Sequence, residues 1–183
     1  MLRISSFTLL FLLFQTVNAQ YYKVTPQGLT PLKTPEKNYL VIEFDSLNKK
    51  ELYKKSIAFI NETYENPKEA IKADTENEYI RVKTYIPNFM KVNNGGVNII
   101  VDNVYTLELK FKDNKVRFEI LDEKFCDSYC VVYSGSKWTS YPIYTKKGKL
   151  RLEKNKLIIE TYFNAKVQTF IDYLKKSKTK DDW

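Results

Sequence analysis

Apolar and polar residues alternate most regularly between Tyr105 and Asp122, in the run YTLELKFKDNKVRFEILD. Every second residue before the central Asp113-Asn114 pair is apolar, and the alternation resumes after the pair. A period of two places apolar side chains on one face of a strand and charged ones on the other. Asp and Asn also tolerate the backbone of a tight hairpin turn. The pattern therefore predicts two half-buried strands joined by a turn at 113–114.

Shorter alternating runs predict three earlier strands, at Tyr39–Asp45, Glu69–Asp74 and Glu78–Ile86. Pro87 is expected to end the last of them, because proline cannot donate to a strand ladder. Odd-numbered positions are then apolar from Val97 to Phe111, and only Asn103 breaks the pattern. A single strand of that length is unusual, so a bend or bulge is expected near Asp102-Asn103.

Two segments carry the three-to-four-residue apolar spacing of a helix that packs on a sheet. The first is Lys49–Tyr64, where Asn48 and Glu51 have the spacing of a capping box. The second is Asn155–Ser177. With the strands, they give the order β-α-β-β-β-β-α. This order predicts an α+β fold in which two helices pack on one face of an antiparallel sheet.

The first residues have the pattern of a secretory signal peptide. Arg3 supplies a positive charge, Ile4–Phe14 is a short apolar run, and Val17-Asn18-Ala19 offers the small residues that signal peptidase requires. We therefore expect cleavage after Ala19, with residues 1–19 as the signal and no membrane-spanning segment in the mature chain. An uncleaved anchor is the alternative, but the apolar run is shorter than the roughly 20 residues that cross a bilayer. Export predicts a periplasmic or extracellular location.

The mature chain divides into three parts by its composition. Residues 20–38 hold three Thr-Pro pairs, which disfavour helix and predict an extended linker. A docking segment for a partner is the alternative for this stretch. Residues 39–178 form the predicted single domain, and the polar residues 179–183 form a tail.

Three segments resemble one family. KELYKKSIAFINETYENPKEAI (Lys50–Ile71), EYIRVK (Glu78–Lys83) and the hairpin YTLELKFKDNKVRFEILD are similar to the secreted Bacteroidota family catalogued as domain of unknown function 4468. The resemblance covers about residues 39–122 and the last helix. It implies a TBP-like fold, secretion and a bacterial source. It implies no activity and no catalytic residues.

Composition removes several kinds of chemistry. The chain has no histidine among its 183 residues, which excludes Ser-His-Asp and Cys-His nucleophile systems and His-based acid-base catalysis. Only five glycines are present, and no glycine-rich phosphate loop is found. No cofactor is therefore expected. Enzymes that use carboxylates, Lys or Tyr are still compatible with this composition.

Cys126 and Cys130 lie four residues apart in CDSYC. In an exported chain, two cysteines most simply form a disulfide. Two free thiols are the alternative. A metal site is disfavoured, because histidine and a second cysteine pair are missing.

Other side chains are candidates for binding. A cluster of aromatic residues in the irregular segment 125–152 could contact a glycan or a peptide, or could instead close the core: Tyr133, Trp138, Tyr141 and Tyr144. Four carboxylates lie close in sequence at Glu119, Asp122, Glu123 and Asp127. Such groups can serve a hydrolase or Ca²⁺, but solvated charge is their usual state. Ser134-Gly135-Ser136 beside Lys137 lacks the neighbouring elements of a Ser-Lys nucleophile and is expected to be a loop.

The net positive charge is concentrated near the C-terminus. Residues 144–183 hold 11 basic and 5 acidic side chains. These lysines could attach the protein to an anionic surface of the envelope. Nucleic-acid binding is not favoured, because the polar face of the hairpin interleaves acids with bases and carries no apolar wedges.

The hypothesis that fits these observations is an exported, non-catalytic binding module of the envelope, whose partner is a protein or a glycan. The segment 125–152 and the open face of the sheet are the expected contact surfaces. Two alternatives are a carboxylate- or Tyr/Lys-based hydrolase of envelope polymers, and electrostatic attachment through the basic C-terminal region.

Overall fold

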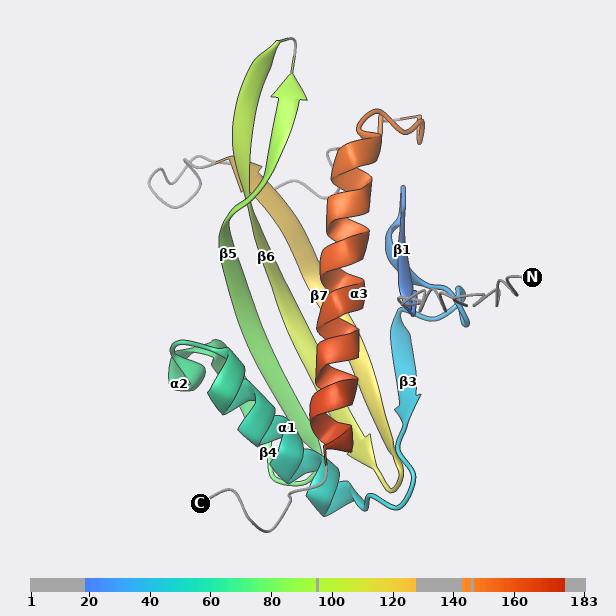
Figure 1. The fold of residues 1–183 in the computed structure, drawn as a ribbon, viewed down its shortest axis with the longest axis vertical. Helices are drawn as coiled ribbons and strands as arrows, with labels where there is room; N and C mark the ends of the chain where they lie inside the picture. Colours follow the sequence, from blue (N-terminus) through green and yellow to red (C-terminus); the bar gives the residue numbers. More distant parts are fainter. Residues whose placement is uncertain (1–18, 95, 128–142, 146, 177–183) are drawn as a thin grey trace, which may run out of the picture.

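The computed structural model describes residues 19–94, 96–127, 143–145 and 147–176. Its strands are β1 (Tyr22–Thr25), β2 (Gly28–Pro31), β3 (Tyr39–Glu43), β4 (Ile71–Thr75), β5 (Tyr79–Asn94), β6 (Val97–Lys112) and β7 (Lys115–Asp127). Its helices are α1 (Lys49–Thr63), α2 (Pro67–Ala70) and α3 (Glu153–Lys175). Five strands form an antiparallel sheet in the order β3-β7-β6-β5-β4, and β1 and β2 form a separate hairpin (Figure 1).

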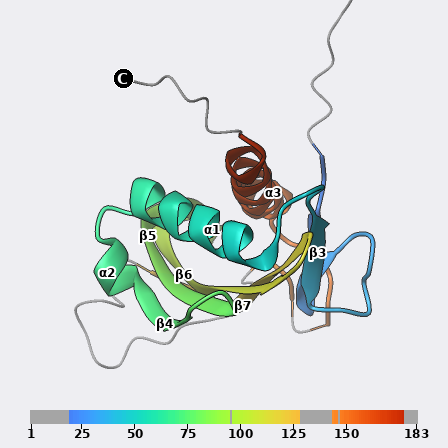
Figure 2. The same ribbon diagram turned by 90° about the horizontal axis from the view of Figure 1, so that it is seen from below.

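Helices α1 and α3 cover the same face of the sheet, as Figure 2 shows from below. Phe170 on α3 meets Phe59 on α1 and Phe118 on β7, with ring centroids 5.4 and 5.5 Å apart. All three rings are buried. Burying such a side chain stabilises the fold by roughly 1.5–3 kcal/mol. The predicted α+β class is confirmed, while the observed order adds the β1-β2 hairpin and the short helix α2.

The start of α1 carries the predicted capping box. The Asn48 side chain accepts a hydrogen bond from the Glu51 backbone N–H at 3.0 Å, and the Glu51 carboxylate accepts one from the Asn48 backbone N–H at 2.9 Å. Further along α1, the Lys55 ammonium donates to the carbonyl oxygens of Leu174 and Lys176. These carbonyls end α3, where cations are favoured by the helix dipole. The contact fixes the two helices to one another.

Strand β5 is longer than the sequence predicted, because Pro87 does not end it. The pairing with β6 shifts between Ile86 and Met90, so Pro87 lies in an irregular stretch. The Asp102 carboxylate on β6 accepts hydrogen bonds from the Asn88 backbone N–H at 2.8 Å and from the Tyr85 hydroxyl at 2.7 Å. A strand tolerates proline where no ladder hydrogen bond is needed, and β4 pairs with β5 only as far as Val82.

Strand β6 runs unbroken from Val97 to Lys112. Its register with β7 shifts between Val104 and Thr106. This irregularity follows Asp102-Asn103 directly along β6, so the predicted bulge is confirmed. The turn predicted at 113–114 is also present, with Asn114 at a positive φ of 62°.

The prediction of an extended linker over Gln20–Asn38 is wrong for residues 22–31. They form the β1-β2 hairpin, which turns at Pro26-Gln27, and β2 begins at Gly28 with a φ of 124°. Tyr22 and Val24 are 0% and 2% exposed and belong to the main core. The Thr-Pro pairs led to the linker prediction. They are compatible with a hairpin, because Pro26 lies in its turn and Pro31 at the end of β2.

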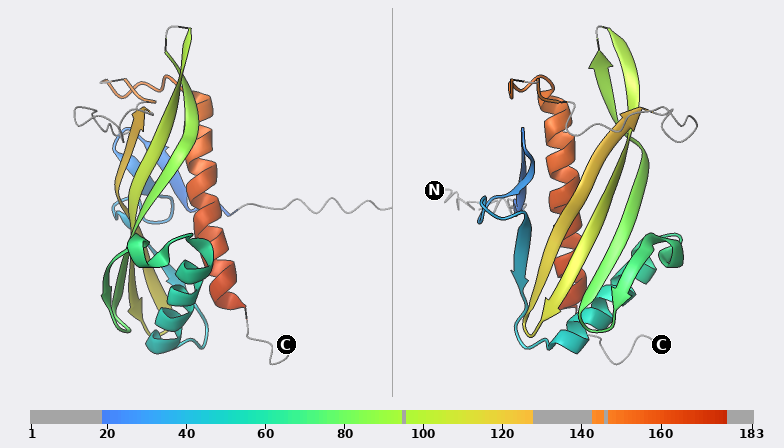
Figure 3. Two further views of the ribbon diagram at one scale, coloured as in Figure 1. Left: turned by 90° about the vertical axis from the view of Figure 1, so that its left-hand side faces the viewer. Right: turned by 180° about the vertical axis from the view of Figure 1, so that it is seen from behind.

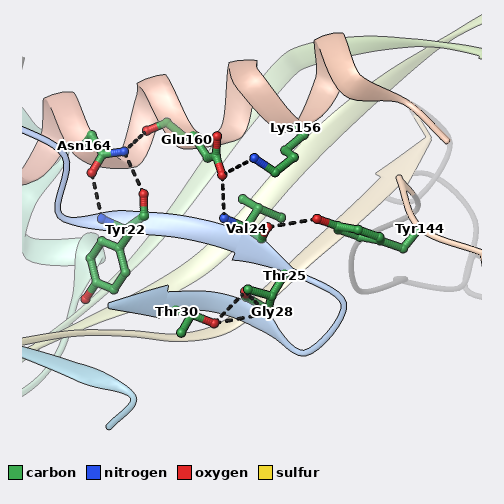
Figure 4. A network of polar contacts seen from close by, with 9 residues as sticks. All are labelled: Tyr22, Val24, Thr25, Gly28, Thr30, Tyr144, Lys156, Glu160 and Asn164. Atoms are coloured by element: carbon green, nitrogen blue, oxygen red, sulfur yellow. Dashed lines mark hydrogen bonds and ion pairs between the residues drawn. The ribbon is translucent and has the colours of Figure 1, made fainter. Parts of the chain in front are cut away.

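Side chains of α3 bond the free edge of β1 (Figure 4). The Asn164 side chain accepts hydrogen bonds from the backbone N–H groups of Tyr21 and Tyr22, at 2.6 and 2.8 Å, and donates one to the Tyr22 carbonyl at 3.0 Å. Glu160 accepts from the Val24 backbone N–H at 2.8 Å and pairs with Lys156 at 2.6 Å. The helix thus supplies the hydrogen bonds that a neighbouring strand would supply.

Candidate functional site

The face of the sheet that points away from α1 and α3 is not covered by any helix in the described part of the chain (Figure 3). We call it the outer face. Its central side chains come from β3, β5, β6 and β7 and are Tyr39, Tyr79, Arg81, Glu108, Lys110, Arg117 and Glu119. Alternation along each strand puts these polar groups here, because the other parity packs in the core.

Glu108 is the acidic centre of one half of the outer face. Its carboxylate accepts hydrogen bonds from Arg81 at 2.9 Å, Lys110 at 2.9 Å and the Tyr79 hydroxyl at 3.2 Å. Burial alone would raise the pKa of Glu108, but the bonds from Arg81 and Lys110 outweigh it and hold that pKa below its ordinary value. The group is therefore ionised at neutral pH.

Glu119 holds the other half of the outer face in place. The Arg117 guanidinium donates to one Glu119 oxygen, from Nε at 3.0 Å and also from Nη2, and the Asn38 side chain donates to the other oxygen. The same guanidinium lies 3.9 Å from the centroid of the Tyr39 ring. Stacking on the ring and bonding to a buried carboxylate leave Arg117 little rotamer freedom.

The two carboxylates are direct neighbours, since Glu108 is opposite Glu119 in the β6-β7 register. They are 5% and 2% exposed. The expectation that Glu119 is a solvated charge is therefore wrong, because its strand lies in the middle of the sheet and Arg117 covers it. A glycosidase pair needs one carboxyl group that stays protonated. Glu108 lacks that property, because the bonds from Arg81 and Lys110 keep it ionised, so it is not the acid of such a pair.

Aromatic rings and cations alternate across the outer face. Tyr79 lies between Arg81 and Lys110, at 5.5 and 5.6 Å from its centroid. A shallow depression of about 770 Å³ opens beside this group, toward Lys49 at the start of α1. Tyr and Arg are the residue types most enriched where proteins bind one another. The outer face therefore gathers these residue types in one place, with ion pairs and ring contacts between them.

Glu123 is a buried acid that the sequence placed in solvent, and that expectation is wrong. The register shift and the positive φ of Asp122 (52°) turn the next side chain inward, and Glu123 is 8% exposed. Burial raises the pKa of Glu123 to about 8, and a hydrogen bond with Asn103 offsets part of that rise. A pocket of about 340 Å³ between Glu123 and Gly28 separates β7 from the β1-β2 hairpin.

The predicted ligand-contact aromatics fall mostly outside the described residues. This holds for Tyr133, Trp138 and Tyr141, so their role stays a prediction. Tyr144 is described and half-buried, and its hydroxyl donates to the Val24 carbonyl at 2.9 Å (Figure 4). It therefore ties the end of the 125–152 segment to β1.

The predicted disulfide and signal sequence also extend beyond the described residues. Cys126 lies buried near the end of β7, opposite Asp102, whereas Cys130 is outside the described part. Residues 1–18 are outside it as well, and Ala19 is exposed. The disulfide and the cleavage after Ala19 stay predictions.

Among the described residues, the basic side chains clustered at the two ends of α3 do not form one surface. Lys154 and Lys156 lie in the first turn of α3, and Lys175 lies in its last turn. A helix of 23 residues is roughly 35 Å long, so the two groups are far apart. Lys156 is also paired with Glu160.

Among the described residues, no three Cys, Asp or Glu side chains gather where they could hold a metal ion. None of the described helices is long and apolar enough to cross a membrane.

No known family profile matches the chain, and no curated protein sequence is significantly similar to it. Two solved structures are similar in fold. A TBP-like protein from Parabacteroides distasonis has a TM-score of 0.52 at 13% identity, covering 76% of this chain and 92% of that one. A DUF4468 family protein from Bacteroides ovatus has a TM-score of 0.49 at 13% identity, covering 78% and 88%. The first similarity confirms the predicted TBP-like α+β fold.

Proposed function

We propose that this chain is an exported, non-catalytic interaction module whose outer face binds the acidic surface of an envelope protein. The observation that carries the proposal is the fixed geometry of Arg81 and Arg117, each bonded to a carboxylate that is at least 95% buried. A side chain that is already ordered loses little entropy when a partner binds. Arginines held in this way serve well as interface anchors.

The charge of the outer face favours an acidic partner. Lys83 on β5 and Lys112 on β6 have the same strand parity as Arg81 and Lys110 and so belong to the outer face. Glu108 and Glu119 each neutralise a bonded arginine, which leaves the cations of Lys83, Lys110 and Lys112 in excess. The flat shape favours a protein over a glycan, because small ligands bind in concave sites. A carboxylate hydrolase is less well supported, since the two buried acids of the outer face, Glu108 and Glu119, are both ion-paired.

Site-specific photo-crosslinking in intact cells tests this function. A photoreactive residue replaces Lys83 or Lys112 on the outer face, or Thr161 on α3 as the control. We expect a protein adduct from the first two positions only. Adding Arg81→Lys and Arg117→Lys keeps a cation beside each buried carboxylate but loses the guanidinium geometry, and should weaken the adduct, whereas Lys154→Glu should not.

The results distinguish the alternatives clearly. Adducts at the control position alone, or at no position, would refute the proposal. An adduct that a glycosidase degrades and a protease leaves intact would identify a glycan as the partner and overturn the protein assignment.

A further inference from the structure

The two edges of the five-stranded sheet are built differently. β4 pairs with β5 irregularly, with a register shift between Ile71 and Ala73, and it carries Lys72 and Asp74. Bulges and charges of this kind prevent edge strands from pairing with other chains. β3 pairs with β7 in unbroken register, and its sequence YLVIE is uncharged until the last residue. Edge β3 therefore lacks the protection that β4 has.

The outward backbone groups of β3 can be assigned from its ladder. The Phe44 backbone N–H donates to the Asn114 carbonyl at 2.8 Å. In an antiparallel pair, alternate residues bond the partner strand and the others point away. Tyr39, Val41 and Glu43 therefore direct their N–H and C=O groups away from β7. No described strand pairs with that edge.

A groove of about 620 Å³ runs along this open edge, between β3 and the C-terminal half of α3. Its apolar floor includes Leu40, Ile42 and Ile171, which are 7–8% exposed. Val41, on the rim, is 51% exposed. The dimensions and lining suit an extended segment that buries every second side chain.

The charge of the groove is positive. Lys33, Lys37 and Lys175 line it, against one acidic residue, Glu43. Within the described residues, none of these three lysines forms an ion pair. An acidic segment would gain from all three charges as it enters. A second copy of this chain would instead bring two sets of lysines together.

We propose that this groove binds an extended peptide segment of a partner protein, rich in acidic residues, which adds to β3 as a further strand. Main-chain hydrogen bonds to Val41 and its outward neighbours provide affinity, and the lysines select acidic sequences. The inference is independent of the outer-face function, because the two surfaces share no lysine.

The test uses residues 20–183 and a fluorescent peptide of alternating Asp and Val, with a Lys-Val peptide as the charge-reversed probe. Fluorescence anisotropy should show saturable binding of the acidic peptide only. Val41→Pro should weaken binding about tenfold or more, since it removes one outward donor. Val41→Thr keeps the donor and should bind normally.

Lys33→Glu with Lys37→Glu and Lys175→Glu should abolish binding of the acidic peptide, while Lys83→Glu with Lys112→Glu on the outer face should not. Circular dichroism establishes that Val41→Pro is folded. Equal binding of both peptides, or normal binding by Val41→Pro, would overturn the proposal. So would a concentration-dependent dimer that Val41→Pro dissolves and that binds no peptide, since the edge would then be a self-interface.

Discussion

Asn164 on α3 bonds both the backbone N–H and the backbone C=O of Tyr22 on β1, at 2.8 and 3.0 Å. Its single side-chain amide thus completes the hydrogen bonding of an edge of β1 beside which no described strand lies. Glu160 does the same for the Val24 N–H, one turn away. The β1-β2 hairpin is therefore an integral part of the domain, even though it lies outside the main sheet.

Asn164→Ala should lower the free energy of unfolding by about 2–4 kcal/mol, because it leaves several partly buried backbone groups without partners. Urea denaturation of residues 20–183 measures the change. Asn98→Ala is the control, since Asn98 accepts an exposed hydrogen bond from Asn93 and should cost less than about 0.5 kcal/mol. Equal stability of Asn164→Ala and the wild type would show that α3 does not hold β1.

The Arg117–Glu119 pair should be strongly coupled. Arg117→Met strands a carboxylate whose side chain is 3% exposed, and we expect a loss of about 3 kcal/mol. Adding Glu119→Gln should recover part of this loss. A double-mutant cycle, measured by urea denaturation, isolates the coupling.

The exposed pair Lys49–Glu78 provides the matched control, with side chains 37% and 63% exposed. Its coupling should be below about 1 kcal/mol. If the two cycles give the same coupling energy, burial does not strengthen the Arg117–Glu119 pair. Glu119 then does not hold the Arg117 side chain in a fixed geometry.

Local periodicity was enough to predict the central part of the fold. The β6-β7 hairpin, the α1 stripe and the Asn48–Glu51 capping box depend on residues that are near in sequence, so their patterns are readable directly. The open polar face of the sheet was also foreseen. These features come from alternation and capping, which act within a few residues.

The missed features depend on contacts across long stretches of sequence. Tyr22 is buried by α3 and β7, more than 90 residues away, as its hydroxyl bond to the Phe118 carbonyl illustrates. The bulge at Asp122 moves the Glu123 side chain to the other face of the sheet. The alternation of apolar and polar residues does not show at which single residue such a bulge occurs. Glu119 is covered by Arg117, two residues away on β7, and by Asn38, which precedes β3 and is brought beside Glu119 by the β3-β7 register.

Asn48→Ala should destabilise the fold by about 1 kcal/mol, because α1 loses the acceptor that caps the Glu51 N–H. Asn66→Ala is the matched control at the start of α2, a helix of four residues where the capping bond is 3.4 Å long. It should cost clearly less. Thermal or urea unfolding distinguishes the two, and an equal cost for both would mean that the capping box adds nothing beyond a single Asx contact.

Glu123 should make stability depend on pH. Burial raises the pKa of its carboxyl from 4.5 to about 8. Between these values the folded protein keeps the proton and the unfolded chain has lost it. The unfolded state therefore binds fewer protons, and the free energy of unfolding falls as pH rises toward 8. Above that pH the loss is complete, at roughly 5 kcal/mol for the full shift.

Glu123→Gln imitates the protonated side chain and should remove this dependence. Urea denaturation at about pH 5 should give similar stabilities for the variant and the wild type, whereas at about pH 9 the variant should be more stable by a few kcal/mol. Glu78→Gln, an exposed carboxyl group, should leave the pH profile unchanged. A wild-type profile parallel to that of Glu123→Gln would mean that Glu123 ionises in the folded protein as it does in water. In that case the pocket between β7 and the β1-β2 hairpin must admit enough solvent to stabilise its charge.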